Sequence, residues 1–185
     1  DKRGHNCEAT MYVKDFVGEY GRYRALGEKA MAQVPDDALN RVMAPDGNSI
    51  AVLVRHIAGN LVSRFTNFLS EDGEKPWRNR DAEFEDGTFR RGDIDAVWHA
   101  GWATLDAELA KLTDADLGRG VTIRGQELTV HAALCRSLAH VSMHVGQIIL
   151  LARMLAPGPW QTLSIPRGQS QAYNKNPALE KQPAR

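Results

Sequence analysis

The sequence is poor in cysteine, carries no net charge and has no long apolar run, and each shortage excludes a class of protein. Its two cysteines, Cys7 and Cys135, are too few for a disulfide framework and favour a reduced, cytoplasmic compartment. The 23 basic side chains balance 23 acidic ones, so neither nucleic acid nor an anionic membrane surface is expected as a partner. The run VGQIILLARML is interrupted by Gln147 and Arg153, and we expect no membrane span. The start, DKRGHNCEAT, lacks the apolar centre of a signal peptide.

Four segments show the spacing of apolar residues that is typical of amphipathic helices, and this predicts an all-α fold. We expect these helices over residues 10–34, 49–69, 94–112 and 130–155. Asn48 or Ser49, Asp93 and Thr129 are the predicted N-caps of the last three. The loops between the helices are too long for a simple up-and-down bundle, and their length permits a crossover connection in a four-helix bundle.

The remaining segments predict the extent of the domain. The alternating stretch VTIRGQELTV, with Gly125 at its turn, suggests a small β-hairpin before the last helix. The 185 residues suit one domain, 1–185, with a core of about 11–174. Residues 1–9 and 175–185 are expected to be flexible.

Three histidines stand in apolar helical segments, where an imidazole needs a partner. His140 and His144 are four residues apart and share one helix face, about 5–6 Å apart at Cβ. His56, in VLVRHIAGN, lies in a similar setting on another helix, and helical bundles build metal sites from such facing side chains. His131 precedes His140 by nine residues, which places it on the opposite face of the helix. Val141 replaces the glutamate of the zincin motif, and the pair alone is a weak signal. Metal binding and simple hydrogen bonding both stay open.

The chain resembles the DinB/YfiT-like superfamily, and within it a bacterial branch with no established activity. The resemblance covers roughly residues 11–174 and rests on NSIAVLVRHIAGNLVSRFTNFLSEDGEKPWRNRDAEF, LAHVSMHVGQI and LSIPRGQSQAYN, in that order. It implies a four-helix bundle with a crossover connection that is often dimeric, so a homodimer is expected. It also implies a divalent metal, zinc, nickel, iron or manganese, held by one histidine of the second helix and a HxxxH pair of the fourth. These positions are His56, His140 and His144 here.

Characterised members of the superfamily imply transfer of a small thiol, such as bacillithiol or mycothiol, to an electrophilic small molecule. Three neutral imidazoles leave the metal its full charge and open coordination positions, where a thiol loses its proton readily. A water in that position would instead become hydroxide, which makes a metal-dependent hydrolase the alternative. A third alternative is a non-catalytic, metal-binding stress-response bundle. No catalytic residue is assigned.

Further polar residues are candidates for binding substrate or orienting the metal ligands. Some lie on the helix faces that carry the histidines, and others lie in the charged stretch DGEKPWRNRD or the C-terminal segment. The arginines there could bind a substrate carboxylate through two parallel hydrogen bonds. The competing interpretation of the charged stretch is an ordinary solvated surface. The candidates are Asn60, Arg64, Gln147, Lys75, Arg78, Arg80 and Arg167.

Overall fold

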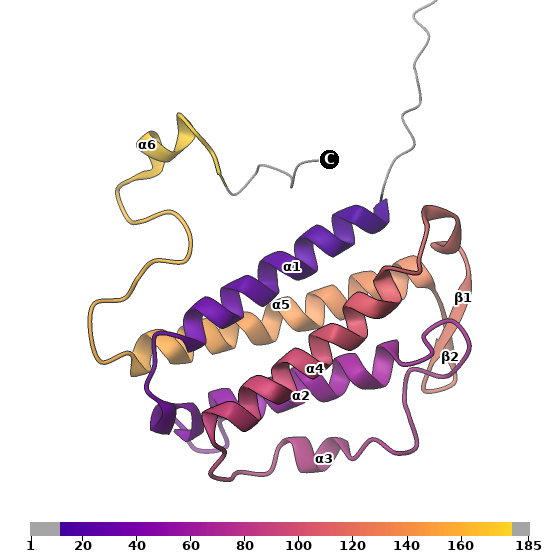
Figure 1. The fold of residues 1–185 in the computed structure, drawn as a ribbon, viewed down its shortest axis with the longest axis horizontal. Helices are drawn as coiled ribbons and strands as arrows, with labels where there is room; N and C mark the ends of the chain where they lie inside the picture. The colour runs from indigo at the N-terminus through magenta and orange to yellow at the C-terminus, as the bar shows by residue number, and fades with distance from the viewer. Residues whose placement is uncertain (1–11, 179–185) are drawn as a thin grey trace, which may run out of the picture.

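The protein, seen here in a computed structural model, is described over residues 12–178 and consists mainly of four long helices (Figure 1). The long helices are α1 (Tyr12–Met31), α2 (Ile50–Phe65), α4 (Arg91–Leu109) and α5 (Val130–Leu155). The short elements are α3 (Arg80–Glu83), α6 (Ser170–Asn174), β1 (Gly120–Ile123) and β2 (Gln126–Thr129), with 3₁₀ turns at Asp36–Asn40 and Asp114–Asp116. The predicted all-α class and the hairpin are confirmed. The flexibility expected of residues 1–9 lies outside the described residues, as does most of 175–185.

Side-chain caps fix the starts of the two helices that later carry the histidines. The Ser49 hydroxyl accepts the backbone N–H of Val52 at 3.2 Å, and the Thr129 hydroxyl accepts that of Ala132 at 3.1 Å, as predicted. The prediction that Asp93 caps the third long helix is wrong. That helix begins earlier, at Arg91, and Asp93 lies in its first turn, where its carboxylate pairs with the Arg90 guanidinium.

The long helices pair in two layers, α1 against α5 and α2 against α4, and the layers close over one apolar core. Helices consecutive in the chain are not always neighbours, because α1 packs chiefly on α5 while α2 packs chiefly on α4. The connections from α1 to α2 and from α4 to α5 therefore cross the bundle (Figure 1). This is the predicted crossover topology, and it leaves α2 and α5 facing each other with few contacts.

The interface between α2 and α4 is unusually close at one point. A Cβ built on Gly101 would stand 2.7 Å from the Cα of Ala58 and 2.9 Å from its Cβ. Only a glycine lets two helix backbones approach to this distance. Trp98 and Trp102, also on α4, are 1 % exposed and pack in the core, as the sequence predicted.

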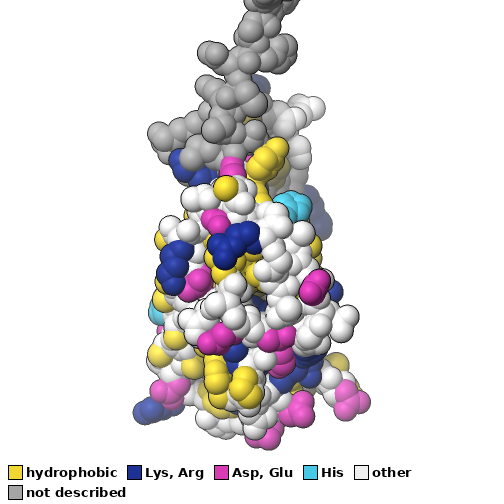
Figure 2. All heavy atoms as spheres, turned by 90° about the vertical axis from the view of Figure 1, so that its right-hand side faces the viewer, with side chains coloured by type: hydrophobic (Ala, Val, Ile, Leu, Met, Phe, Trp, Pro, Cys, Tyr) yellow, Lys and Arg dark blue, Asp and Glu magenta, His cyan; other side chains and the backbone are white. Residues whose placement is uncertain are grey.

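The hairpin is tied to the loop that follows α2. Arg124 and Gly125 form its two-residue turn with φ of 55° and 70°, as the favoured hairpin turn requires. The carboxylate of Asp72 accepts the backbone N–H groups of Arg124, Gly125 and Glu74 at 2.7–2.8 Å. These bonds, with that of Gly125 the largest influence, lower the pKa of Asp72 to about 2. On the hairpin end of the molecule, acidic and basic side chains intermingle (Figure 2).

Helix α5 is the longest element. Among residues 12–178 it is the one helix long and apolar enough to cross a membrane by length and composition, although the sequence had suggested no such segment. In the fold, Val141, Val145 and Ile148 on its apolar face are fully buried in the core. Its remaining faces carry the polar side chains considered next.

Candidate metal centre

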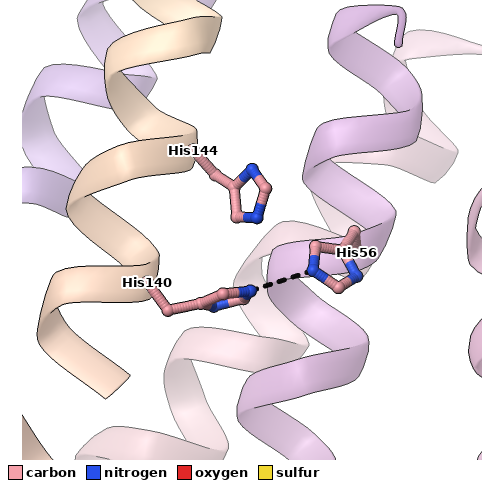
Figure 3. Close-up of side chains that lie close together, drawn as sticks. All are labelled: His56, His140 and His144. Carbon is pink, nitrogen blue, oxygen red and sulfur yellow. Dashed lines mark hydrogen bonds between the residues drawn. The ribbon is translucent and has the colours of Figure 1, made fainter. Parts of the chain in front are cut away.

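The three histidines meet between α2 and α5. His56 projects from α2, and His140 and His144 project from successive turns of α5 toward it (Figure 3). The ring centroids are 4.6–5.0 Å apart, and the Nε2 atoms of His56 and His140 are separated by 2.9 Å. His56 and His144 are buried, while His140 is half-buried. The spacing that singled out these residues therefore corresponds to one cluster in space.

Two of the rings are held by acceptors at their outer nitrogens. The Nδ1 of His56 lies 2.9 Å from the Glu83 carboxylate, and that of His144 lies 2.8 Å from the side-chain oxygen of Gln147. A carboxylate or an amide oxygen can only accept, so both rings carry a proton on Nδ1. With that tautomer, Nε2 is the nitrogen available as an acceptor, and the Nε2 of His56 can accept the hydrogen bond from the Nε2–H of His140 at 2.9 Å. The Nδ1 of His140 is buried without a hydrogen-bond partner among the described residues.

The electrostatic surroundings keep the imidazoles on α5 neutral. Burial lowers the pKa of His140 to about 3, and the neighbouring His144, His56, Arg78 and Arg64 add to this effect. Burial also lowers the pKa of His144, against a smaller opposing influence of the bond to Gln147. Neutral imidazole is the form that binds a metal, so these two rings are ready to do so without losing a proton at neutral pH.

The arrangement fits a divalent cation. One nitrogen of each ring can be chosen so that the three lie within 4.8 Å of one another. Zinc–nitrogen bonds of about 2.0–2.1 Å place tetrahedral ligand nitrogens roughly 3.3 Å apart, so modest rotations of the rings would suffice. A hydrogen bond between Nε2 atoms joins His56 to His140, and the buried Nδ1 of His140 has no hydrogen-bond partner among the described residues. Three neutral nitrogen donors suit zinc, nickel, iron and related ions.

A buried ion pair beside the cluster joins Arg78, one of the predicted candidates, to Glu83, which the sequence did not single out. Glu83, the last residue of α3, is 9 % exposed, and Arg78 binds both of its oxygens at 2.8 and 2.9 Å. Burial would raise the pKa of Glu83, but bonds from His56 and Arg78, with the charge of Arg78, hold it below its usual value. The ring of Phe84 rests on His56, with centroids 4.5 Å apart. Glu83 and Phe84 lie in the stretch DAEF, whose sequence resembles that of an ordinary solvated loop.

The other sequence-predicted candidates are distributed between the cluster and more distant positions. Asn60 is half-buried on α2, one turn beyond His56. Arg64 binds the backbone oxygen of Gly73 and the Glu74 carboxylate. Their roles toward a substrate stay predictions.

The loop and tail candidates differ sharply in burial. The Lys75 side chain is buried, and its ammonium binds the backbone oxygen of Asp72 and the Glu71 carboxylate. Arg80 is half-exposed, with its guanidinium 4.8 Å from the centre of the Phe84 ring. Arg167 is exposed in the C-terminal segment, which Figure 1 shows running outside the bundle. Of the loop and tail candidates, Arg78 is linked to His56 through Glu83 and Arg80 through Phe84, whereas no such link joins Lys75 or Arg167 to the histidines among the described contacts.

Comparison with known proteins agrees with the fold. The model of a family described as a protein of unknown function, DUF1572, matches residues 7–169. The chain belongs to the DUF1572 family. A search of the curated proteins gave no match.

A solved structure has a similar fold. The chain is similar to a DinB-like protein from Bacillus cereus ATCC 10987, with a TM-score of 0.54 and 19 % sequence identity. The similarity covers 80 % of this chain and 95 % of that one. At this identity it supports the fold alone. The two matches therefore assign the chain to the DUF1572 family and give it the fold of a DinB-like protein, which is the fold that the resemblance in the sequence implied.

Proposed function

We propose that the protein binds one divalent metal ion through His56, His140 and His144 and uses it to transfer a small thiol to an electrophilic small molecule. The observation that carries the proposal is the convergence of three imidazoles, two of them with Nδ1 anchored and Nε2 turned inward. A cation bound there would act as a Lewis acid that favours the thiolate form of a thiol.

The residues of the chain would supply the binding and the geometry. Three neutral imidazoles add no negative charge, so the cation keeps its charge for an incoming anion. Glu83 and Gln147 hold two of the rings in orientation. Phe84 covers one side of His56, which limits access of water from that side. Arg80, above Phe84, offers a positive charge to an anionic group on the substrate.

Two features favour a thiol over a water nucleophile. The described cysteine, Cys135, is exposed and projects from the face of α5 opposite His144, so it does not supply a thiol to the cluster. The carboxylate in contact with the cluster, Glu83, already accepts bonds from Arg78 and His56 on both oxygens and is poorly placed to take a proton from water. A metal-held thiol ionises near neutral pH with no such base.

Metal content tests the binding half of the proposal. We expect one equivalent of a divalent metal in the purified protein, or after loading with zinc, and a loss of at least tenfold in affinity in His56→Ala. His131→Ala is the matched control, because His131 is an exposed histidine on the same helix as the α5 ligands. Full occupancy in His56→Ala would refute the site.

Turnover tests the catalytic half. The zinc-, nickel-, iron- and manganese-loaded proteins are each mixed with monochlorobimane and glutathione, bacillithiol or mycothiol. We expect a rate above that of the metal-free protein with at least one thiol, lost in His144→Ala. Ester hydrolysis without thiol would instead identify a hydrolase. Stoichiometric metal with neither reaction would leave the non-catalytic bundle as the function.

A further inference from the structure

The Glu83 carboxylate is placed with more precision than a surface loop requires. It ends the four-residue helix α3, which is held on α2 by the Arg55 guanidinium through the backbone oxygens of Ala82 and Glu85 at 2.5 and 3.0 Å. Its Oε2 then lies 2.9 Å from the Nδ1 of His56. A buried carboxylate costs free energy unless it is fully hydrogen-bonded, so the surrounding residues must supply donors and space for it.

Arg78 provides the donors. Its Nε donates to one oxygen of Glu83 and its Nη2 to the other, at 2.8 and 2.9 Å, and its side chain is only 3 % exposed. Such a two-point contact fixes the plane of the carboxylate as well as its position. The plane determines which oxygen faces His56. The pair therefore acts as an orienting device and not only as a neutralising one.

Gly59 provides the space. It lies in the middle of α2, where glycine costs roughly 1 kcal/mol relative to alanine. A Cβ at this position would stand 2.3 Å from Oε1 of Glu83 and 2.7 Å from its carboxyl carbon. The carboxylate thus occupies the space that any other residue at position 59 would fill. Glycine is a poor helix former, and it stands at the position of α2 where the Glu83 carboxylate makes this close approach.

We propose that Glu83 is a positioning residue of the metal site, which acts through His56 and is itself held by Arg78 and Gly59. By accepting from Nδ1 it fixes His56 in the tautomer whose Nε2 lone pair faces the other two histidines, and it fixes the rotation of the ring. Carboxylates behind metal-bound histidines have this effect on orientation and on ligand basicity in other metal sites. The inference rests on the proposed metal site, and its experiment separates the two.

Glu83→Gln is the direct test, with Glu74→Gln as its control. Glutamine offers one oxygen where Arg78 and His56 together need two acceptors, so the ring of His56 loses its fixed orientation. We expect a 10–100-fold loss of affinity for Co²⁺ and Zn²⁺ and a changed visible spectrum of bound Co²⁺. Glu74 lies in the same loop and binds Arg64, and its carboxylate lies 3.9 Å from the guanidinium of Arg78, but it contacts no histidine among the described residues. We expect its variant to bind within about twofold of the natural protein.

A glycine pair supplies an independent test in case Glu83→Gln does not fold. Gly59→Ala removes no polar group but pushes the Glu83 carboxylate away from its position, so we expect the same loss of affinity and the same spectral change. Gly21→Ala is the control, since a Cβ at this position of α1 meets nothing within 4 Å. Circular dichroism and the Tm of each metal-free variant confirm that it folds.

The outcomes separate positioning from binding. Unchanged affinity and spectrum in both Glu83→Gln and Gly59→Ala, with binding lost in His56→Ala, would overturn the role of Glu83 and leave the metal site intact. An equal loss in Glu74→Gln would also overturn it, because loop packing would then explain the effect. Retained binding in His56→Ala would overturn the proposed site itself.

Discussion

The close contact between α2 and α4 predicts how much a methyl group added at Gly101 would reduce the free energy of unfolding. In Gly101→Ala the new Cβ would stand 2.7 Å from the Cα of Ala58, whereas carbon atoms pack at about 3.5–4.0 Å. Because the obstructing atom belongs to the backbone, it cannot rotate away, and the helices must separate by roughly 1 Å. Overpacking of this kind costs about 1–3 kcal/mol. We expect a steric cost near 2–3 kcal/mol, which places the Tm of Gly101→Ala roughly 4–12 °C below that of a Gly→Ala variant whose new Cβ meets no obstruction.

Gly21→Ala is the reference for this measurement. Both substitutions gain the same helix propensity, about 1 kcal/mol, but a Cβ at position 21 meets nothing within 4 Å. The difference between the two free energies of unfolding, from urea titrations, isolates the steric cost. His56 lies two residues before Ala58, so the metal affinity of Gly101→Ala should also fall. A difference in unfolding free energy below about 0.5 kcal/mol would refute the close approach of α2 and α4.

Three further expectations follow from the same geometry. Zinc at 100 times its dissociation constant should stabilise the protein by about 2.7 kcal/mol and raise Tm by roughly 5–11 °C in a thermal melt, and His56→Ala should abolish the shift. Asp72→Ala should cost roughly 1–2 kcal/mol at pH 7 in urea titrations, after allowance for the exposure of this carboxyl, because three backbone N–H groups lose their acceptor. Since folding lowers the pKa of Asp72 to about 2 from an ordinary value of about 3.9, this stabilisation is complete above pH 4–5 and is lost as the pH falls toward 2, so the two proteins should then converge in stability. Tyr20→Phe should cost about 1 kcal/mol of unfolding free energy, because the buried hydroxyl donates to the backbone oxygen of Leu134 at 3.1 Å.

The helices could be predicted where their signals were local. The period of apolar residues located all four, and the caps Ser49 and Thr129 fixed two starts because a cap acts within three residues. The second helix was predicted to reach residue 69, yet it ends at Phe65. Asn67 adopts a φ of 50° there, and no apolar pattern records that turn. The four-residue α3 was missed because its charged sequence has no period to detect.

The histidines of the site could be predicted from the sequence, but the residue that orients His56, Glu83, could not. His140 and His144 are recognisable as a pair four residues apart, and His56 is recognisable as a polar residue inside an apolar helix. Glu83 comes 27 residues after its partner His56, in a stretch as charged as any solvated loop. Only the fold of the loop back onto α2 brings the two together, and that return depends on tertiary contacts such as those of Arg55.

The contacts that stabilise the bundle and the residues that would bind a metal lie on different faces of α2. Its closest packing lies between α2 and α4, with Gly101 against Ala58, and its largest core side chains include Trp98 and Trp102 of α4. The histidines occupy the other face of α2, opposite α5, where apolar contact is sparse. The three imidazoles contribute little to folding there, because they bury polar atoms and the Nδ1 of His140 has no hydrogen-bond partner among the described residues. Removing His56 should therefore abolish metal binding while the metal-free fold survives, and a variant that lost both would show that the cluster is part of the structural core.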